Sequence, residues 1–242
     1  MLTSAQLVNL ACQTAKVPGW TQLAGQKLNL ILQELSQAYD IATNRQTFNF
    51  TFNSGTGTQS GPYTLPANWL RANRDDVFYV ILGVTYRMTP ISLAEYDALV
   101  QQAGLSEYPA KYAVDNSALA SQGSPVMYVW PPPSGSFPVT ARYFAQMPDI
   151  LTPETSAVIP WFPSQVYLER RLSGEMMLLS NDDRAVVFLG GRDENGFEGA
   201  AALLDRYLKS EGDSQVVKTV TLDRRLFGPS FDRAKNTKTI GF

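Results

Sequence analysis

The chain has 242 residues, of which 44% are hydrophobic and 17% are charged. This composition supplies a core for one large domain or two modest ones, and it excludes a wholly disordered chain. The sequence has no histidine and only one cysteine, Cys12. These counts exclude Ser-His-Asp and Cys-His catalysis, histidine-based zinc sites and an intrachain disulfide. A low proportion of charge is typical of a surface that becomes buried in an assembly.

The net charge of −2 is unevenly distributed along the chain. Residues 164–213 carry ten acidic and six basic side chains, whereas residues 214–242 carry six basic and two acidic ones. The N-terminal residues lack the basic and apolar regions of a signal peptide, and no apolar stretch approaches about 18 residues. We therefore expect a soluble protein made in a cytoplasm, with a basic tail that binds a partner.

Two helices are predicted at the N-terminus. Residues 3–16 form the first, with Thr3 or Ser4 as the cap and Cys12 as a small buried hydrophobe. Residues 21–43 form the second, because apolar residues recur there every three or four positions. The break at residues 18–20 makes an antiparallel pair the expected arrangement.

The period then changes to that of β-strands. Residues 47–53 alternate strictly, with Phe48, Phe50 and Phe52 on one face. Further strands are predicted at residues 63–66, 76–83, 84–88, 111–114, 126–130 and 139–144. The strands at residues 76–83 and 84–88 pair across Gly83, and residues 54–62 form a loop.

A helix over residues 93–103 interrupts the strands. Ser92 and Glu95 have the spacing of a capping box, and Gly104 is suited to end the helix. Helices return after a crossing segment at residues 147–163, over residues 163–179, 183–189 and 197–209.

This order predicts an α+β fold, in which a helical bundle from the N- and C-terminal helices carries an inserted antiparallel β region and an extended C-terminal arm. We divide the chain into residues 1–45 and 151–213 for the helical body, 46–150 for the β region, and 214–242 for the arm.

No motif indicates a catalytic, metal or cofactor site. The glycine-rich residues 55–61 precede a strand, not a helix, so we expect a hairpin loop and no phosphate site. Residues 191–196 lack the ligands that complete a calcium loop, which predicts a polar turn. The acidic pairs at residues 75–76 and 182–183 each adjoin an arginine and are interpreted as end caps and solvated charge.

The tail is the candidate binding site. Its bases and apolar side chains cannot form a core alone, which favours a docking arm over a frayed terminus. The residues assigned to binding are Arg224, Arg225, Leu226, Phe227, Phe231, Arg233, Lys235 and Phe242. A second group of aromatics, Trp130, Tyr143, Phe144, Trp161 and Phe162, is expected in a core or a subunit interface because few bases accompany it.

Several segments in order resemble the head-to-tail adaptor, or connector, proteins of tailed bacteriophages, of the tail-tubular-A-like and short-tailed-phage types. The carrying segments are the long helix followed by QTFNF at residues 46–50, YTLPANW at 63–69, PISLAEY at 90–96, YPAKYA at 108–113, VMYVWPPP at 126–133 and TARYF at 140–144. The resemblance implies a structural virion protein without enzymatic activity or cofactor.

The resemblance also implies an assembly of twelve copies in a ring below the portal. That ring would join head to tail, contact the next tail or nozzle component, and retain double-stranded DNA in its channel until ejection. An acidic lining from residues 164–213 would suit such a channel, because phosphate contacts would slow the DNA. Two alternatives stay open: a tail or baseplate component that contacts glycan or receptor through its aromatics, and a metal-dependent hydrolase that uses the acidic pairs.

Overall fold

The N-terminal helix pair forms at the predicted place. Helix α1 (Ser4–Thr14) begins with a capping box, in which the Thr3 hydroxyl accepts from the Gln6 N–H and the Gln6 side chain accepts from the Thr3 N–H. Helix α2 (Thr21–Ala38) ends at Ala38, so the predicted end at residue 43 is wrong. Tyr39 is extended there, which turns the chain and places Ile41 inside the core with no exposed surface.

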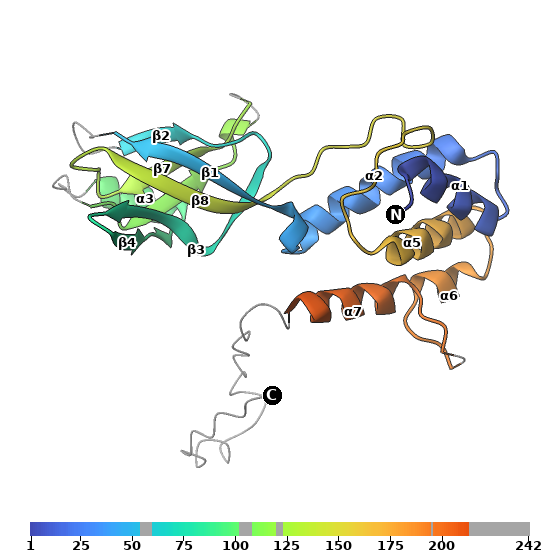
Figure 1. The fold of residues 1–242 in the computed structure, drawn as a ribbon. Coiled ribbons are helices and arrows are strands. Elements are labelled where there is room, and N and C mark those ends of the chain that lie inside the picture. Colours follow the sequence, from blue (N-terminus) through green and yellow to red (C-terminus); the bar gives the residue numbers. More distant parts are fainter. Residues whose placement is uncertain (54–59, 102–107, 120–122, 195, 213–242) are drawn as a thin grey trace, which may run out of the picture.

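The chain forms two lobes that lie side by side (Figure 1). The computed structural model describes residues 1–53, 60–101, 108–119, 123–194 and 196–212. One lobe contains α1 and α2 together with the C-terminal helices, and the other contains the strands. The chain leaves the helical lobe after α2 and returns after the last strand, so the β region is an insertion between two helical blocks (Figure 1).

Helix α5 is the central element of the helical lobe. The C-terminal helices are α5 (Gln165–Leu179), α6 (Ala185–Leu189) and α7 (Ala200–Gly212). Helix α5 contacts both α1 and α2 on one side and both α6 and α7 on the other (Figure 1). Its Leu168, Leu172 and Met176 are fully buried in one core with Leu7 and Leu28. The two helical blocks therefore stabilise one another through burial of apolar surface.

The β lobe consists of two four-stranded sheets. Its strands are β1 (Arg45–Phe52), β2 (Ser60–Thr64), β3 (Trp69–Ile81), β4 (Val84–Arg87), β5 (Thr89–Pro90), β6 (Lys111–Asp115), β7 (Val126–Trp130) and β8 (Phe137–Ala145). The order is β1-β8-β3-β4 in one sheet and β2-β7-β6-β5 in the other. Every pairing is antiparallel except that of β5 with β6, which is parallel and two residues long.

The hairpin predicted at Gly83 is confirmed. Strands β3 and β4 pair antiparallel, and Leu82 and Gly83 between them have φ values of 49° and 81°. Two consecutive positive φ values are those of a type I′ turn, whose twist matches paired strands. Strand β3 begins at Trp69, well before the predicted residue 76, because Trp69 and Arg71 already pair with the end of β8.

The remaining helices support the predicted fold class. Helix α3 (Leu93–Val100) begins with the capping box of Ser92 and Glu95, whereas Gly104 lies outside the described residues. Helix α7 begins at Ala200, three residues later than predicted, since Arg192 and Glu198 form a β-bridge before it. The prediction of an α+β fold, with helices at both ends of a β region, is confirmed.

Candidate assembly surfaces

A polar cluster joins three strands where the β lobe meets the helical lobe. The Tyr143 hydroxyl of β8 lies 2.9 Å from Gln46 Oε1 of β1 and 3.0 Å from Asn68 Oδ1. Asn68 Nδ2 donates to the same Gln46 oxygen at 3.2 Å. The Trp69 ring stacks on the Tyr143 ring with centroids 4.6 Å apart. Burial raises the pKa of the Tyr143 hydroxyl, so it stays a neutral hydrogen-bonding group.

Arg71 of β3 forms the ionic connection between the lobes. Its Nε donates to Asp40 Oδ1 at 2.7 Å, and its Nη1 donates to the Gln37 carbonyl at the end of α2 at 2.9 Å. Its guanidinium also lies 5.5 Å from the centre of the Phe144 ring. Both ionic side chains are partly exposed, and such pairs contribute about 0–1 kcal/mol. The contacts therefore orient the lobes more than they stabilise them.

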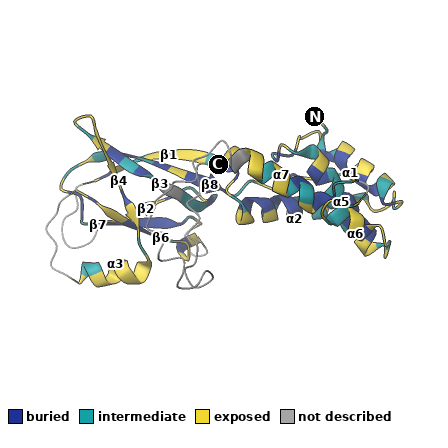
Figure 2. Ribbon diagram, turned by 90° about the horizontal axis from the view of Figure 1, so that it is seen from below, coloured by how far each residue is buried: buried dark blue, intermediate teal, exposed yellow. Residues whose placement is uncertain are grey.

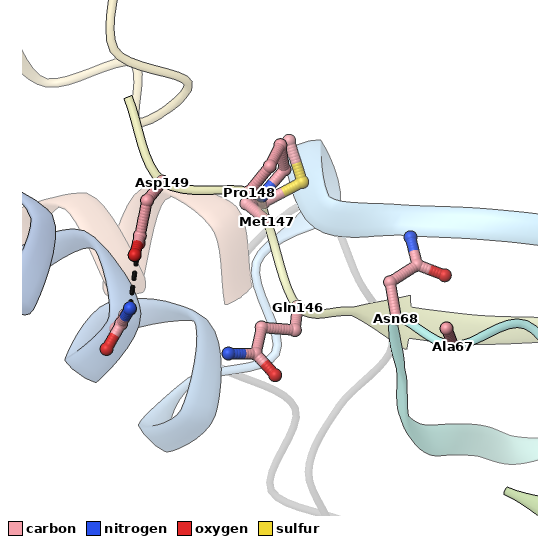
Figure 3. Close-up of a pocket in the computed structure, with 7 residues that line it drawn as sticks. Ala67, Asn68, Gln146, Met147, Pro148 and Asp149 are labelled. Carbon is pink, nitrogen blue, oxygen red and sulfur yellow. Dashed lines mark hydrogen bonds between the residues drawn. The ribbon is translucent and has the colours of Figure 1, made fainter. Parts of the chain in front are cut away.

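The crossing segment after β8 is held against α2 by two amide side chains. Asn29 donates to the Ile150 carbonyl at 3.0 Å and accepts from the Ile150 N–H at 3.1 Å. Gln33 Nε2 donates to Asp149 Oδ1 at 2.7 Å, and Figure 3 shows this contact. These bonds satisfy polar groups of a segment that has no regular secondary structure, which fixes its path along the helix.

A hollow of about 420 Å³ lies between the two lobes (Figure 3). Its lining consists of Gln33, Ala67, Asn68, Gln146, Met147, Pro148 and Asp149. Asp149 is the only ionisable residue among them, and Gln33 already binds it. The lining therefore provides no nucleophile with a neighbouring base and no set of metal ligands.

Two groups of exposed apolar side chains lie at different places in the helical lobe. The first group is Trp20, Leu23 and Leu30, and Leu30 is 56% exposed. We call them the α2 surface. The second group is Leu178 at the end of α5 with Val186 and Val187 of α6, and Val186 is 76% exposed; we call these the α6 surface. Helices α2 and α6 both contact α5 and lie on different sides of it (Figure 1), so the two surfaces are separate parts of the lobe.

Comparison with known protein families gives a match that covers most of the chain. Residues 2–221 match the family described as SU10 adaptor protein. The chain belongs to this family. It is accordingly a structural adaptor protein of a bacteriophage virion, a component of the tail neck that associates with portal and tail components. No curated protein matched the chain.

Several acidic residues of the C-terminal helical block form ion pairs. Within residues 164–212, Glu175 Oε1 lies 3.2 Å from Arg171 Nη2. Asp182 Oδ2 lies 2.6 Å from Arg184 Nη2, and Asp205 Oδ2 lies 2.6 Å from Lys209 Nζ. Glu169 and Glu198 have arginine partners too. The local field of this block is therefore weaker than its residue count indicates.

The motifs set aside in the sequence have structural roles. Asp193 Oδ1 accepts from the Phe197 N–H at 2.6 Å within the predicted polar turn. Asp76 lies 3.7 Å from Arg142, and Cys12 is buried in the helical core. Within the described ranges, no group of three or more acidic, cysteine or histidine residues is placed to hold a metal ion. None of the described helices is long and apolar enough to cross a membrane.

The predicted binding residues lie outside the described residues. Helix α7 ends at Gly212, and Arg224, Arg225, Leu226, Phe227, Phe231, Arg233, Lys235 and Phe242 all follow it. The sequence did not identify the cluster of Gln46, Asn68 and Tyr143. Tyr143 is 97 residues from Gln46 along the chain, and no local pattern reports such a contact.

Three of the five aromatics considered for stacking belong to the two cores: Tyr143 to the core of the β lobe, and Phe162 with Trp161 packed against it to the helical core. Tyr143, Phe144 and Phe162 are buried, whereas Trp130 and Trp161 are partly buried. Phe162 packs edge-on against Tyr167 and Tyr207 in the helical lobe. These side chains are packing residues of the adaptor, as predicted for a core.

Proposed function

We propose that twelve copies of this adaptor form a closed ring below the portal. The ring would join head to tail, continue the DNA channel, and retain packaged DNA until ejection. The observation that carries this proposal is the adaptor family match together with two separate groups of exposed apolar side chains on the helical lobe. A ring that closes by rotation needs two different complementary surfaces on each copy, and the α2 and α6 surfaces meet that requirement.

Each segment of the chain would have its own role in the proposed ring. Residues 1–45 and 151–213 would form the ring body, because the two apolar surfaces belong to them. Residues 46–150 would face the next tail or nozzle component. Residues 214–242 would reach the portal, with Arg224 and Arg225 pairing with acidic groups there.

The charge distribution supports passage of DNA without tight binding. Among the described residues of α5 to α7, five acidic side chains are paired with bases, which leaves fewer bases there for contacts with phosphate. A protein that neutralises many phosphates releases counterions and binds DNA firmly. A channel built from this lobe would instead let DNA move.

The ring contact can be tested with two charged substitutions. Leu30→Glu disables the α2 surface and Val186→Glu disables the α6 surface, and both side chains are exposed, so the fold should tolerate them. Portal-bound assemblies would be counted by mass spectrometry and by images of the neck. Each variant alone should fail to form rings, while Leu82→Glu on the β3–β4 turn, where Leu82 is 99% exposed, should form them normally.

Mixing the two variants gives a sharper result. Each retains one intact surface, so an α2 variant and an α6 variant should join as a pair that cannot grow. Complete rings from either variant would contradict the assigned contact. A neck that contains a single copy or a trimer of this chain would contradict the ring itself.

A further inference from the structure

Strand β1 is an edge strand with an unpaired side. It pairs with β8 over eight consecutive residues without a register shift. In an antiparallel pair, half of the backbone N–H and C=O groups point away from the partner. No strand in the described part of the chain pairs with those groups of β1, since β1 is the last strand of its sheet.

This edge lacks the features that usually prevent strands from pairing. Residues 46–52 contain no charged residue, no proline and no glycine. The opposite edge strand of the same sheet, β4, is only four residues long and ends with Arg87. Long uncharged edges attract another strand, so they are normally shortened, charged or covered. Figure 2 shows β1 along the outside of the lobe, and Gln46, Thr47, Asn49 and Thr51 are exposed.

The inner face of β1 is also incompletely covered. Phe52 is fully buried, but Phe48 and Phe50 are only half-buried and stack on each other with centroids 5.3 Å apart. The outer face carries polar side chains, including Thr47 and Asn49. A strand added to this edge would need apolar side chains on the inner face and polar ones on the outer face.

The C-terminal tail contains a segment with this pattern. Residues 216–222 read VVKTVTL, which is rich in β-branched residues and close to β1 in length. Val216, Lys218, Val220 and Leu222 share one face, which is apolar at three of its four positions. Val217, Thr219 and Thr221 share the other face, which is polar at two of its three positions. The family match continues to residue 221, so it includes this segment and stops before the rest of the tail.

The position of α7 brings the segment within reach. Helix α7 runs toward the β lobe and ends at Gly212 near the junction where β1 begins (Figure 1). Three residues then precede the segment, and three extended residues span about 10 Å. We propose that residues 216–222 dock as an added strand along the free edge of β1. The inference does not depend on ring formation or on the portal, because residues 224–242 remain free for that contact.

Cysteine pairs in the full chain test this docking directly. A disulfide forms only when the two Cα atoms lie within about 7 Å, and the one native cysteine, Cys12, is buried. Asn49→Cys would be combined with Thr219→Cys or Thr221→Cys and oxidised. A matched control places the first cysteine at exposed Thr85 on β4. We expect a bond with position 49 in one of the two pairs and none with position 85.

Mixing the single variants identifies which copy supplies the strand. A bond within one chain and a bond between two chains both support the docking. The absence of a bond at position 49, or equal bonding at position 85, overturns it. Failure of the ring would not affect this readout, so the two proposals can fail separately.

Hydrogen exchange gives an independent measurement. Val217→Pro with Val220→Pro removes two backbone donors and prevents pairing of the segment. Exchange of the β1 amides that face the free edge should become at least about tenfold faster, while the control Thr237→Pro with Thr239→Pro leaves it unchanged. Equal exchange in both variants overturns the proposal.

Discussion

Asp182, one residue of the acidic pair at residues 182–183, is bound by the neighbouring Arg184. The Arg184 guanidinium donates two hydrogen bonds to Asp182 at 2.6 and 3.0 Å, and the Arg184 N–H donates a third at 3.0 Å. These bonds favour the charged carboxylate and lower the pKa of Asp182 to about 2. Asp182 therefore stays charged and helps to shape the turn between α5 and α6.

The titration of Asp182 gives a pH prediction. Its pKa is lower in the folded state, so its stabilising effect is complete above about pH 4 and is lost as the pH falls toward 2. Carboxyl NMR titration should give a midpoint near 2. The variant Arg184→Gln should return the midpoint toward 3.8. Asp115, whose pKa is lowered by Ser117, should keep its midpoint in that variant, and a shift there would indicate a wider rearrangement.

At the scale of elements, β1 combines a local pattern with uneven burial. The alternation of Phe48, Phe50 and Phe52 predicts one apolar face, and the structure confirms that face against the core of the β lobe. The side chains of this face become more buried toward Phe52, because the Tyr63 and Tyr79 rings pack against the Phe52 ring. The ring centroids lie 5.0 Å and 6.1 Å from that of Phe52. Each phenylalanine therefore contributes differently to stability.

Substitution of the two rings should show this difference. Phe52→Ala should lower the free energy of unfolding by about 3–5 kcal/mol, because it empties a fully buried site. Phe50→Ala should lower it by less, since Phe50 is only half-buried. Denaturant unfolding measures both. If Phe50→Ala leaves stability unchanged but abolishes assembly, its exposed part belongs to an interface.

A glycine determines how closely α6 approaches α5. A Cβ at Gly174 would lie 2.6 Å from Leu189 Cδ2 and 3.2 Å from Phe188 Cβ. Gly174→Ala should therefore lower the free energy of unfolding by about 1–3 kcal/mol despite its better helix propensity. Gly19→Ala is the matched control, because nothing lies within 4 Å of its Cβ. Equal melting temperatures for the two variants would contradict this prediction, because they would show that α6 can move away from the added methyl group without loss of stability.

At the scale of the whole molecule, the described cores and the proposed attachment arm occupy different parts of the chain. Within the part of the chain that the structure describes, the buried residues of the two cores lie between Leu7 and Leu203. The helical core joins both ends of this range around α5, while the β lobe connects through β1, β8 and Arg71. Truncation of the tail can therefore separate attachment from folding.

Deletion of residues 214–242 should leave a folded, soluble protein that no longer attaches to filled heads. Ordering a tail costs roughly 1–2 kcal/mol per residue in backbone entropy, which a partner must offset. Deletion of residues 224–242 alone should have the same effect, because it removes the predicted anchors and keeps the segment at 216–222. Sedimentation with filled heads measures attachment. Equal attachment of the truncated and full-length proteins, or failure of the shorter proteins to fold, would refute the assignment.

The sequence by itself determined the element types and their order. The capping boxes at Thr3 and Ser92, the turn at Gly83 and the alternation of β1 depend on residues a few positions apart. Such interactions are local, so spacing alone reports them. The resemblance to phage adaptors rested on short segments in order, such as QTFNF at residues 46–50 and PISLAEY at 90–96, and it is confirmed by the family match.

Only the tertiary structure decided the contacts between distant segments. Arg45 pairs with Phe144, and Arg71 donates a hydrogen bond to Asp40. No local period in the sequence relates the residues of either pair. The end of α2 at Ala38 was not predicted from the local pattern either. The two apolar surfaces depend on which side of α5 each helix occupies. The physical reason is that burial and edge pairing are properties of neighbours in space, whereas the sequence pattern records only neighbours along the chain.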